Sequence, residues 1–529
     1  MQSSTVPERK RSGSIKGSDL FWLSLILILA AGLRFYHLDV RPFHHDEALH
    51  AFFSFNISPG LRGYKFDPVY HGPFLYWLEA NLFHFFGAGD FSARIPPAVF
   101  ATLLPLLCFF LRDELGHWGW ITAALFITLS PSFTFYGRFL AHDNYVAVFT
   151  LGMVILGLRY GRSDNPLFLY LLALIMGLFI STKACFYIHT GIFVLFGMCV
   201  FALGTFAPRY GRKQLISETR QRLARQKLHF LLAFLLFWLV YALLYSSFFS
   251  HPQGIVDGIV KMLRYWGNQQ AHPRLPGPPY YYLPRLLLHE PLTYLALPAL
   301  IMIGRKPVKP FTLFLAFWSF IALLIYSFAQ EKVPWLLVHP LLPMALLTGT
   351  LAQRLAGKRK YRPGLVLLLL FLGAWSLRET TWLCFQSPPE APHLLRYMET
   401  STDTKETAQC ILALDDRRGQ VFITGDATWV MAWYLRDKGV TYSLPKGWQK
   451  TAVAVVTNKT FHPELSGFHR EYKRLRSWWL PDYRHLMSRE LPDYLFRHRT
   501  TEPVGITHFY SYIRDPTPRE SPGNTHKAR

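Results

Sequence analysis

Residues 41–56, "RPFHHDEALHAFFSFN", place acidic and imidazole side chains together just after the first long apolar run. Asp46 and Glu47 are adjacent carboxylates, flanked by His44, His45 and His50. A carboxylate can accept a proton from an attacking hydroxyl, but in the first turn of a helix it can also simply complement the helix dipole. The pattern favours a functional role for Asp46, whereas both roles stay open for Glu47.

The same segment raises a metal hypothesis. Imidazole and carboxylate groups at close approach suit a divalent ion, which would be held by His45, Asp46 and His50. The spacing matches no recognised ligand motif, and histidines that merely lie at a membrane interface are the competing interpretation. No other cofactor is indicated.

Further ionisable side chains fall in short turns between apolar runs, where an unpaired charge is costly. Arg138 and Asp143 flank one turn, Lys183 ends "STK", and Lys332 follows Glu331 in "EKVP". Each turn has a structural alternative: an Arg138 to Asp143 ion pair, snorkelling of Lys183, and a Glu331 to Lys332 pair.

Two polar loops add candidates for binding. His71 lies in "HGPFLYW", a break followed by an aromatic amphipathic segment that we expect along the membrane surface. Arg274 and Tyr281 lie in "AHPRLPGPPYYYLP", which suits an interfacial lid, although tyrosines also form aromatic belts.

Composition assigns these residues to a membrane protein. Hydrophobic residues make up 51% of the chain and charged residues 17%. The net charge of +23 sits in clusters between apolar runs, as the positive-inside rule expects, so we predict no nucleic-acid partner. About eleven spans are predicted, at residues 20–38, 93–111, 119–136, 143–160, 167–182, 184–204, 229–249, 286–304, 311–328, 334–352 and 364–384.

The basic loops set the orientation. If "PERKRSGSIKG" stays in the cytoplasm, the other basic loops also fall inside. Asp46, the turn from Arg138 to Asp143, Lys183 and Lys332 then face outward. The first apolar run has no small-x-small cleavage site after it, which favours an uncleaved anchor in a multi-pass protein of the cell membrane.

Four regions are predicted. Residues 1–19 form a cytoplasmic basic tail, 20–385 a mainly α transmembrane domain with interfacial helices in the first outer loop, 386–515 a small extracytoplasmic α/β domain, and 516–529 a disordered tail. Within the third, "CILALDDRRGQVFITGD", "ATWVMAWYLRDKG", "VTYSLP" and "TAVAVVTN" are predicted as strand, helix, strand and strand.

Together, these groups would line one outer cavity that holds carboxylates and several cations. Transfer of a group from a lipid-linked phosphate to a hydroxyl requires both: a carboxylate to accept the proton, and Arg or Lys to stabilise the departing phosphate.

The chain resembles the integral-membrane C-type glycosyltransferases, in particular the protein O-mannosyltransferase and aminoarabinose-transferase branch. The resemblance covers roughly residues 20–355. It rests on the Asp46–Glu47 pair, "PFLYW", "SARIPPAVF", the Arg138 to Asp143 turn, "STK" and "EKVPWLLVHPLLP". "HHDEALHAF", "FDPVYHGPFLYW", "GPPYYYLP", "EKVPW" and "WYLRD" are similar to a prokaryotic subfamily labelled flippase-activity-associated or glycosyltransferase-like.

The resemblance implies a polyprenyl-phosphate-dependent hexosyl- or pentosyltransferase that acts with inversion on a lipid, glycan or protein acceptor outside the membrane. Asp46 would be the catalytic base, with Glu47 and Asp143 ordering the acceptor site. Aminoarabinose transferases carry Lys-Pro-Pro where this chain has His71-Gly72-Pro73, which puts phosphate binding by that segment in doubt. The candidates for binding the donor and its phosphate are Arg138, Lys183, Arg274, Lys332, His71 and Tyr281.

Two other classes remain open. A flippase or transporter of lipid-linked sugar would also have many spans, but would be expected to show inverted halves with broken helices, which the sequence does not show. The other is a non-catalytic scaffold for envelope glycan assembly.

Overall fold

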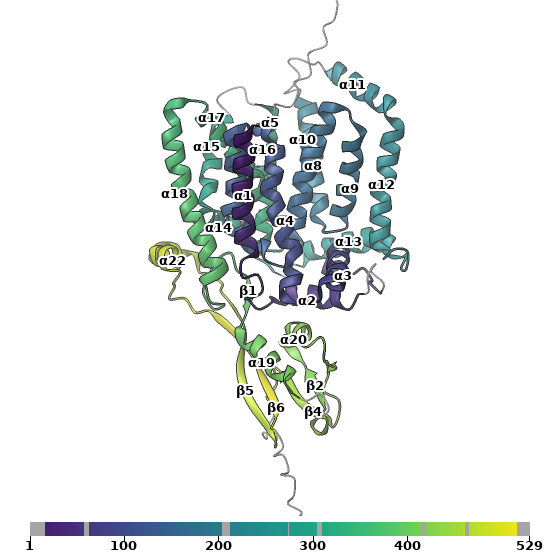
Figure 1. Cartoon of the computed structure of the whole chain (residues 1–529), viewed down its shortest axis with the longest axis vertical. Coiled ribbons are helices and arrows are strands. Elements are labelled where there is room, and N and C mark those ends of the chain that lie inside the picture. Colours follow the sequence, from purple (N-terminus) through teal and green to yellow (C-terminus); the bar gives the residue numbers. More distant parts are fainter. Residues whose placement is uncertain are drawn as a thin grey trace, which may run out of the picture. The chain divides into compact units, whose positions relative to one another are not determined.

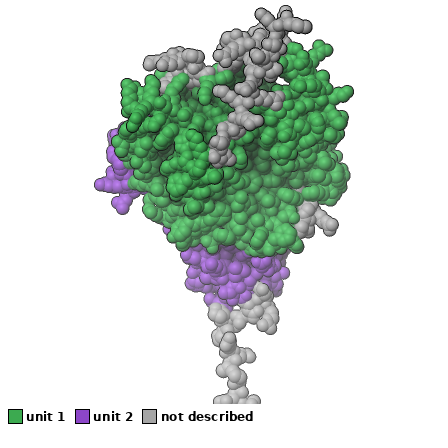
Figure 2. Space-filling view, turned by 45° about the horizontal axis from the view of Figure 1, so that its top comes forward, with its two compact units in different colours: residues 1–40, 53–387 green, residues 41–52, 388–529 purple. Residues whose placement is uncertain are grey.

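The computed structural model describes residues 16–57, 63–203, 212–272, 275–303, 309–414, 419–460 and 465–515. It divides into two compact units, coloured separately in Figure 2. Unit 1 comprises residues 1–40 and 53–387, and unit 2 comprises residues 41–52 and 388–529. Most of the predicted basic tail and all of the predicted disordered tail lie outside the described residues.

The apolar runs of unit 1 form a bundle of helices that lie side by side (Figure 1). Among the described residues, eight helical stretches are long and apolar enough to cross a membrane. They contain α1 (Gly17–Phe35), α4 (Asp90–Phe110), α8 (Asp143–Ser163), α10 (Cys185–Leu203), α12 (Lys227–Tyr245), α16 (Pro310–Phe328), α17 (Val338–Ala356) and α18 (Arg362–Thr381).

Three further apolar helices are shorter. They are α6 (His117–Leu129), α9 (Pro166–Ile180) and the pair η2 (Pro291–Leu295) and α15 (Ala296–Ile303). Each of the eleven predicted spans coincides with one of these helices, so the chain is a multi-pass membrane protein. The count of eleven crossings is not confirmed, because three of the helices fall short of a full span.

Small residues let the helices of unit 1 approach closely. A Cβ atom built on Gly349 of α17 would lie 2.4 Å from the carbonyl oxygen of Gly119 in α6. Without a hydrophobic driving force between helices in lipid, such close packing is a main source of association. The glycine pair therefore fixes the crossing of α6 and α17, which carries His339 of the site described below.

Shorter elements connect the spans. The two predicted interfacial segments form α2 (His45–Phe55) and α3 (Phe74–Phe86), and α2 runs across the boundary between the units. The others are η1 (Pro68–Tyr70), α5 (Arg112–Leu115), α7 (Pro131–Gly137), α11 (Arg212–Arg225), α13 (Gly254–Ala271), α14 (Tyr282–His289), η3 (Pro334–Leu337), η4 (Arg359–Tyr361) and η5 (Trp382–Gln386).

Unit 2 is built on a six-stranded sheet with the order β1-β5-β6-β4-β2-β3. β2 is parallel to β3 and β4, and the pairs β4–β6, β5–β6 and β1–β5 are antiparallel. The strands are β1 (Met398–Thr400), β2 (Gln420–Ile423), β3 (Val440–Thr441), β4 (Ala452–Thr457), β5 (Phe468–Trp478) and β6 (Gly505–Arg514). The helices and helical turns of this unit are α19 (Thr402–Leu412), η7 (Gly425–Ala427), α20 (Thr428–Tyr434), η8 (Trp448–Lys450), α21 (Tyr483–His485), η9 (Leu486–Glu490) and α22 (Leu491–Arg497).

The small α/β domain is confirmed. β4, "AVAVVT", is buried along its whole length between β2 and β6, as its uninterrupted apolar sequence requires. Phe422, Trp448, Val455 and Tyr512 pack together in the core. One local prediction is wrong: residues 410–412 end helix α19 rather than begin a strand, which starts only at Gln420.

Candidate functional site

A buried ionic cluster lies in unit 1, where the start of α8, the turn after α9 and the start of α17 meet. The Lys183 ammonium donates to both carboxylate oxygens of Asp143, at 2.8 and 3.1 Å. His339 Nε2 lies 2.9 Å from Oδ1 of the same carboxylate. The Asp143 side chain is 2% exposed. A charge at such depth must be paired, and the two basic side chains do this.

Local sequence places each member of this cluster. Asp143 is the first residue of α8, so its carboxylate faces the positive end of the helix dipole. α9 ends at Ile180, and the Lys183 amide then donates to the Phe179 carbonyl, which closes the "STK" turn. Burial lowers the pKa of Lys183, but the Asp143 charge, the hydrogen bond to Asp143 and other nearby groups together outweigh burial and raise the pKa overall. Lys183 is therefore the charged partner of Asp143, and the predicted roles of these two residues in substrate binding stay predictions.

Arg138 has a different role from the predicted alternative of a local pair with Asp143. Its guanidinium donates to the backbone carbonyls at the end of α1 and just beyond it, at distances of 2.7 to 3.2 Å. These acceptors are Leu33, Arg34, Tyr36 and His37. A cation is favourable there because the carbonyls that end a helix have no partner inside it. Arg138 thus anchors α1, and its phosphate-binding role stays a prediction.

The segment His71-Gly72-Pro73 docks on the "STK" turn. The Gly72 amide donates to the Thr182 carbonyl at 3.0 Å, and the Phe74 amide donates to the Ser181 carbonyl at 2.9 Å. A Cβ atom on Gly72 would lie 2.2 Å from the Ser181 carbonyl oxygen. Only glycine permits this approach, so the glycine that interrupts the expected lysine motif is a packing requirement.

His71 is brought close to the cluster by this docking. Its ring centroid lies 4.9 Å from that of His142, the residue before Asp143, and 6.1 Å from that of Trp266, whose ring is parallel to it. The structure therefore places His71, Asp143 and Lys183 in one region of unit 1. Its proposed contact with the donor stays a prediction.

The remaining predicted binding residues, Lys332 of the "EKVP" turn and the lid residues Tyr281 and Arg274, are placed in part. The Lys332 ammonium donates to the carbonyls of Tyr326, Ser327 and Ala329 at the end of α16, at 3.1, 2.6 and 2.5 Å, and burial lowers its pKa to about 8. Tyr281 stacks under the Arg285 guanidinium, 3.4 Å from the ring centroid. Arg274 lies outside the described residues.

Asp46 and Glu47 belong to unit 2 and differ in their surroundings. The Asp46 side chain is 42% exposed, with the His44 Nδ1 atom 3.8 Å away. Glu47 is buried, accepts the His44 backbone N–H at 3.0 Å and lies 3.7 Å from Arg41. Glu47 thus caps the start of α2, which agrees with the structural alternative to catalysis, and catalytic roles for both carboxylates stay predictions.

Helix geometry bears on the predicted metal set. Asp46 and His50 are four residues apart and share a face of α2, whereas His45 points about 100° away from Asp46. Burial lowers the pKa of His45 to about 4, so its ring is neutral near pH 7. The three donors therefore do not share one face of α2, and the metal site stays a prediction.

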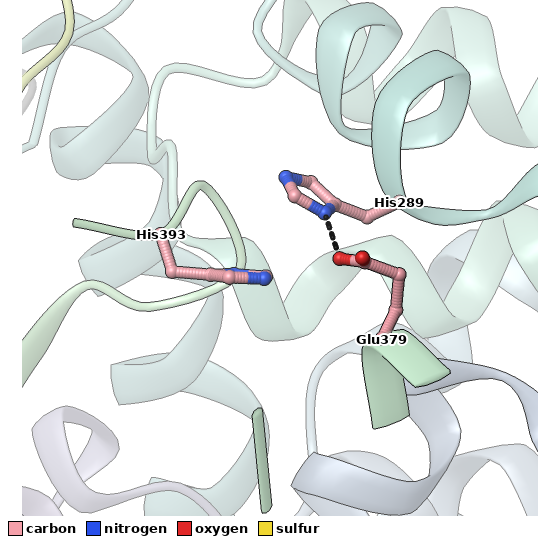
Figure 3. Close-up of side chains that lie close together, drawn as sticks. All are labelled: His289, Glu379 and His393. Atoms are coloured by element: carbon pink, nitrogen blue, oxygen red, sulfur yellow. Dashed lines mark hydrogen bonds and ion pairs between the residues drawn. The ribbon is translucent and has the colours of Figure 1, made fainter. Parts of the chain in front are cut away.

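Two interactions were not predicted from the sequence. His339 was not singled out, although a histidine inside an apolar run is a recognised signal of function in membranes. Figure 3 shows a second buried pair, in which His289 Nδ1 lies 3.2 Å from a Glu379 carboxylate oxygen. This pair links the end of α14 to α18.

Known proteins support the same architecture. Residues 70–245 match the family model described as dolichyl-phosphate-mannose-protein mannosyltransferase. The crystal structure of ArnT from Cupriavidus metallidurans in the apo state matches with a TM-score of 0.57 and 16% identity, over 80% of this chain and 86% of that one. The chain has the C-type glycosyltransferase fold. This confirms the predicted resemblance and fold class.

A second structure with this C-type glycosyltransferase fold is the oligosaccharyltransferase from Archaeoglobus fulgidus, in complex with Zn and sulfate. It matches with a TM-score of 0.50 and 14% identity, over 79% of this chain and 62% of that one. No curated protein matches the chain. The segment matched by the family model contains His71, Arg138, Asp143 and Lys183 but not Asp46.

Proposed function

We propose that this chain is a membrane glycosyltransferase that moves a sugar from a polyprenyl-phosphate donor to a lipid, glycan or protein acceptor at the outer face of the cell membrane. The observation that carries the proposal is the C-type glycosyltransferase fold, in which the family model matches residues 70–245. Within that matched region, the Asp143–Lys183 pair and the docked His71-Gly72-Pro73 segment hold the candidate binding residues close together. Dolichyl phosphate, in the description of that model, is a polyprenyl phosphate, which supports this class of donor.

In the proposed reaction, Asp46 is the general base. The acceptor hydroxyl gives its proton to the Asp46 carboxylate while its oxygen forms a bond to the anomeric carbon of the sugar. The bond from that carbon to the phosphate oxygen breaks, and the polyprenyl phosphate leaves with the electron pair. The exposure of Asp46 supports this role, because a base must reach its substrate.

The leaving phosphate needs a cation, and we favour Lys332. Lys183 is already compensated by the Asp143 carboxylate, and Arg138 donates to four carbonyl groups. The Lys332 ammonium donates to three carbonyl groups and lies 5.9 Å from the centroid of the Tyr282 ring, and these neutral partners do not offset the burial that lowers its pKa to about 8. A phosphate beside Lys332 would supply the missing negative charge.

The test compares Asp46→Asn with Asp437→Asn, which removes a 69% exposed carboxylate elsewhere in unit 2. The purified full chain in nanodiscs receives undecaprenyl-phosphate mannose and a membrane extract of the source organism, and released undecaprenyl phosphate is measured. We expect release to fall at least about 100-fold in Asp46→Asn, the scale of general base catalysis, and to stay unchanged in Asp437→Asn.

The same variants separate the two other classes. In cells, a transferase that has lost its base accumulates lipid-linked donor, whereas a scaffold with Asp46→Asn behaves like the original chain. A transporter would instead lose movement of the donor across vesicle membranes. Release by Asp46→Asn at the original rate would refute the proposed base.

A further inference from the structure

Residues 41–52, which carry Asp46, are part of unit 2 although they precede most of unit 1 in the sequence. Phe43, Ala48 and Ala51 in this segment are fully buried, and Leu49 is nearly so. One side of this segment is therefore buried against other residues. The residues that cover it show what holds Asp46 in place.

Helix α20 supplies the central contact. The Phe43 ring stacks on Trp433, with centroids 5.2 Å apart and an angle of 18° between the rings. The Phe43 backbone N–H donates to the Tyr434 hydroxyl oxygen at 2.9 Å. Trp433 is fully buried. A stacked aromatic pair beside a hydrogen bond to the backbone fixes both the side chain and the path of the chain three residues before Asp46.

Two more contacts hold the segment on either side of Asp46. Before it, the Arg41 guanidinium lies 3.3 Å from Glu399 of β1 and 3.7 Å from Glu47 of α2. After it, the Phe52 ring packs 6.4 Å from both Trp429 of α20 and Tyr442, which follows β3. The sheet domain therefore contacts the segment at both ends as well as at Phe43.

We propose that unit 2 positions the base: Trp433, Tyr434 and Glu399 hold residues 41–52 so that the Asp46 carboxylate is presented at a fixed place for proton transfer. The inference rests on the proposed function for the role of Asp46. It assigns a task to the C-terminal sheet domain, whose aromatic helix α20 acts as a positioning element for catalysis.

The physical reason is that the rate of proton transfer depends strongly on the positions of the reacting groups. Displacement of a reacting group by about 1 Å can cost about 100-fold in rate. If α20 loosens, Asp46 moves relative to the acceptor hydroxyl, and kcat falls. The KM for the donor stays unchanged in this proposal, because Trp433, Tyr434 and Glu399 are not among the residues proposed to bind the donor phosphate.

Two measurements on the full chain in nanodiscs test the proposal. Hydrogen exchange of peptides that cover residues 41–52 reports how firmly the segment is held, and turnover of undecaprenyl-phosphate mannose reports kcat and KM. The variants are Trp433→Leu, Trp433→Phe, which keeps a ring for stacking, and Tyr434→Phe, which removes only the oxygen that accepts the Phe43 N–H. Tyr472→Leu is the control, because Tyr472 is a 60% exposed aromatic residue of the same unit.

We expect exchange of residues 41–52 to rise about tenfold in Trp433→Leu and kcat to fall about 10- to 100-fold, with the donor KM within twofold of the original. Trp433→Phe should restore most of both losses, and Tyr472→Leu should change neither. If Trp433→Leu also raises exchange in β4, unit 2 has opened as a whole and that variant is not informative. The milder variant Tyr434→Phe is then used, and it should raise exchange of residues 41–52 and lower kcat without raising exchange in β4.

Unchanged exchange in residues 41–52 would overturn the proposal, as would faster exchange with unchanged kcat. If the wild-type protein shows no transferase activity, the proposed function is refuted instead. Exchange alone would then decide whether unit 2 holds the segment.

Discussion

Asp143 of unit 1 and Asp46 of unit 2 are both acids at the start of a helix, yet their surroundings are opposite. Asp143 is 2% exposed and bound by Lys183 and His339, whereas the Asp46 side chain is 42% exposed. A buried carboxylate with two basic partners fixes the geometry of the segments around it. A half-exposed carboxylate can exchange a proton with a substrate. The comparison suggests a division between a carboxylate that holds structure and one that does chemistry.

Removal of each acid in turn tests whether Asp143 and Asp46 differ in this way. Asp143→Ala leaves the Lys183 ammonium buried without its partner, and we expect a loss of about 3 to 5 kcal/mol in the free energy of unfolding. Asp46→Ala should change it by no more than about 0.5 kcal/mol. Detergent titration in mixed micelles, followed by tryptophan fluorescence, measures both.

The double variant Asp143→Ala/Lys183→Met provides the control. It removes both charges, so it should recover part of the stability that Asp143→Ala loses. Equal losses from Asp143→Ala and Asp46→Ala would end the distinction between the two acids.

A smaller effect is expected from Gly72→Ala. The added Cβ atom would meet the Ser181 carbonyl, so the segment must move away from the "STK" turn that carries Lys183. We expect a loss of about 1 to 3 kcal/mol, typical of overpacking, measured by the same titration. Gly191→Ala in α10 is the matched control, because no atom lies within 4 Å of its added Cβ. A loss of the same size in both variants would show that the approach at Gly72 is not what matters.

The smallest expected effect concerns pH and unit 2. Burial lowers the pKa of His45 from 6.5 to about 4 in the folded chain, so the unfolded chain binds more protons between these values. The part of the free energy of unfolding that depends on neutral His45 is therefore fully present above about pH 6.5, and it is lost as the pH falls toward 4. Between pH 6.5 and 5 we expect His45 to account for a loss of about 1.5 kcal/mol in the free energy of unfolding.

His45→Asn should remove this part of the pH dependence, as seen in unfolding titrations at pH 6.5 and pH 5. An unchanged pH dependence in the variant would mean that His45 is as accessible to protons in the folded chain as in the unfolded one.

The helices were predictable because each span depends on local composition alone. α1, α10 and α12 follow directly from uninterrupted apolar runs. β5 was not predicted, because charged residues such as Arg470, Lys473 and Arg474 interrupt any apolar alternation in a strand of which only Leu475 and Ser477 are buried.

The candidate site was predictable only in part. The sequence indicated Asp143 and Lys183 as functional residues on the same side of the membrane. It did not reveal that they pair with each other, since 40 residues separate them and only the packing of α8 against α9 brings them together. Equally, no local signal joins residues 41–52 to a sheet that begins at Met398.

The discontinuous make-up of unit 2 limits how the protein can be recombined. A chimera that exchanges only the C-terminal region with a relative would separate Phe43 from its native Trp433 and Arg41 from its native Glu399. Grafts should therefore transfer residues 41–52 and the C-terminal sheet domain as one cassette, and libraries that vary one of the two pieces should vary the other with it.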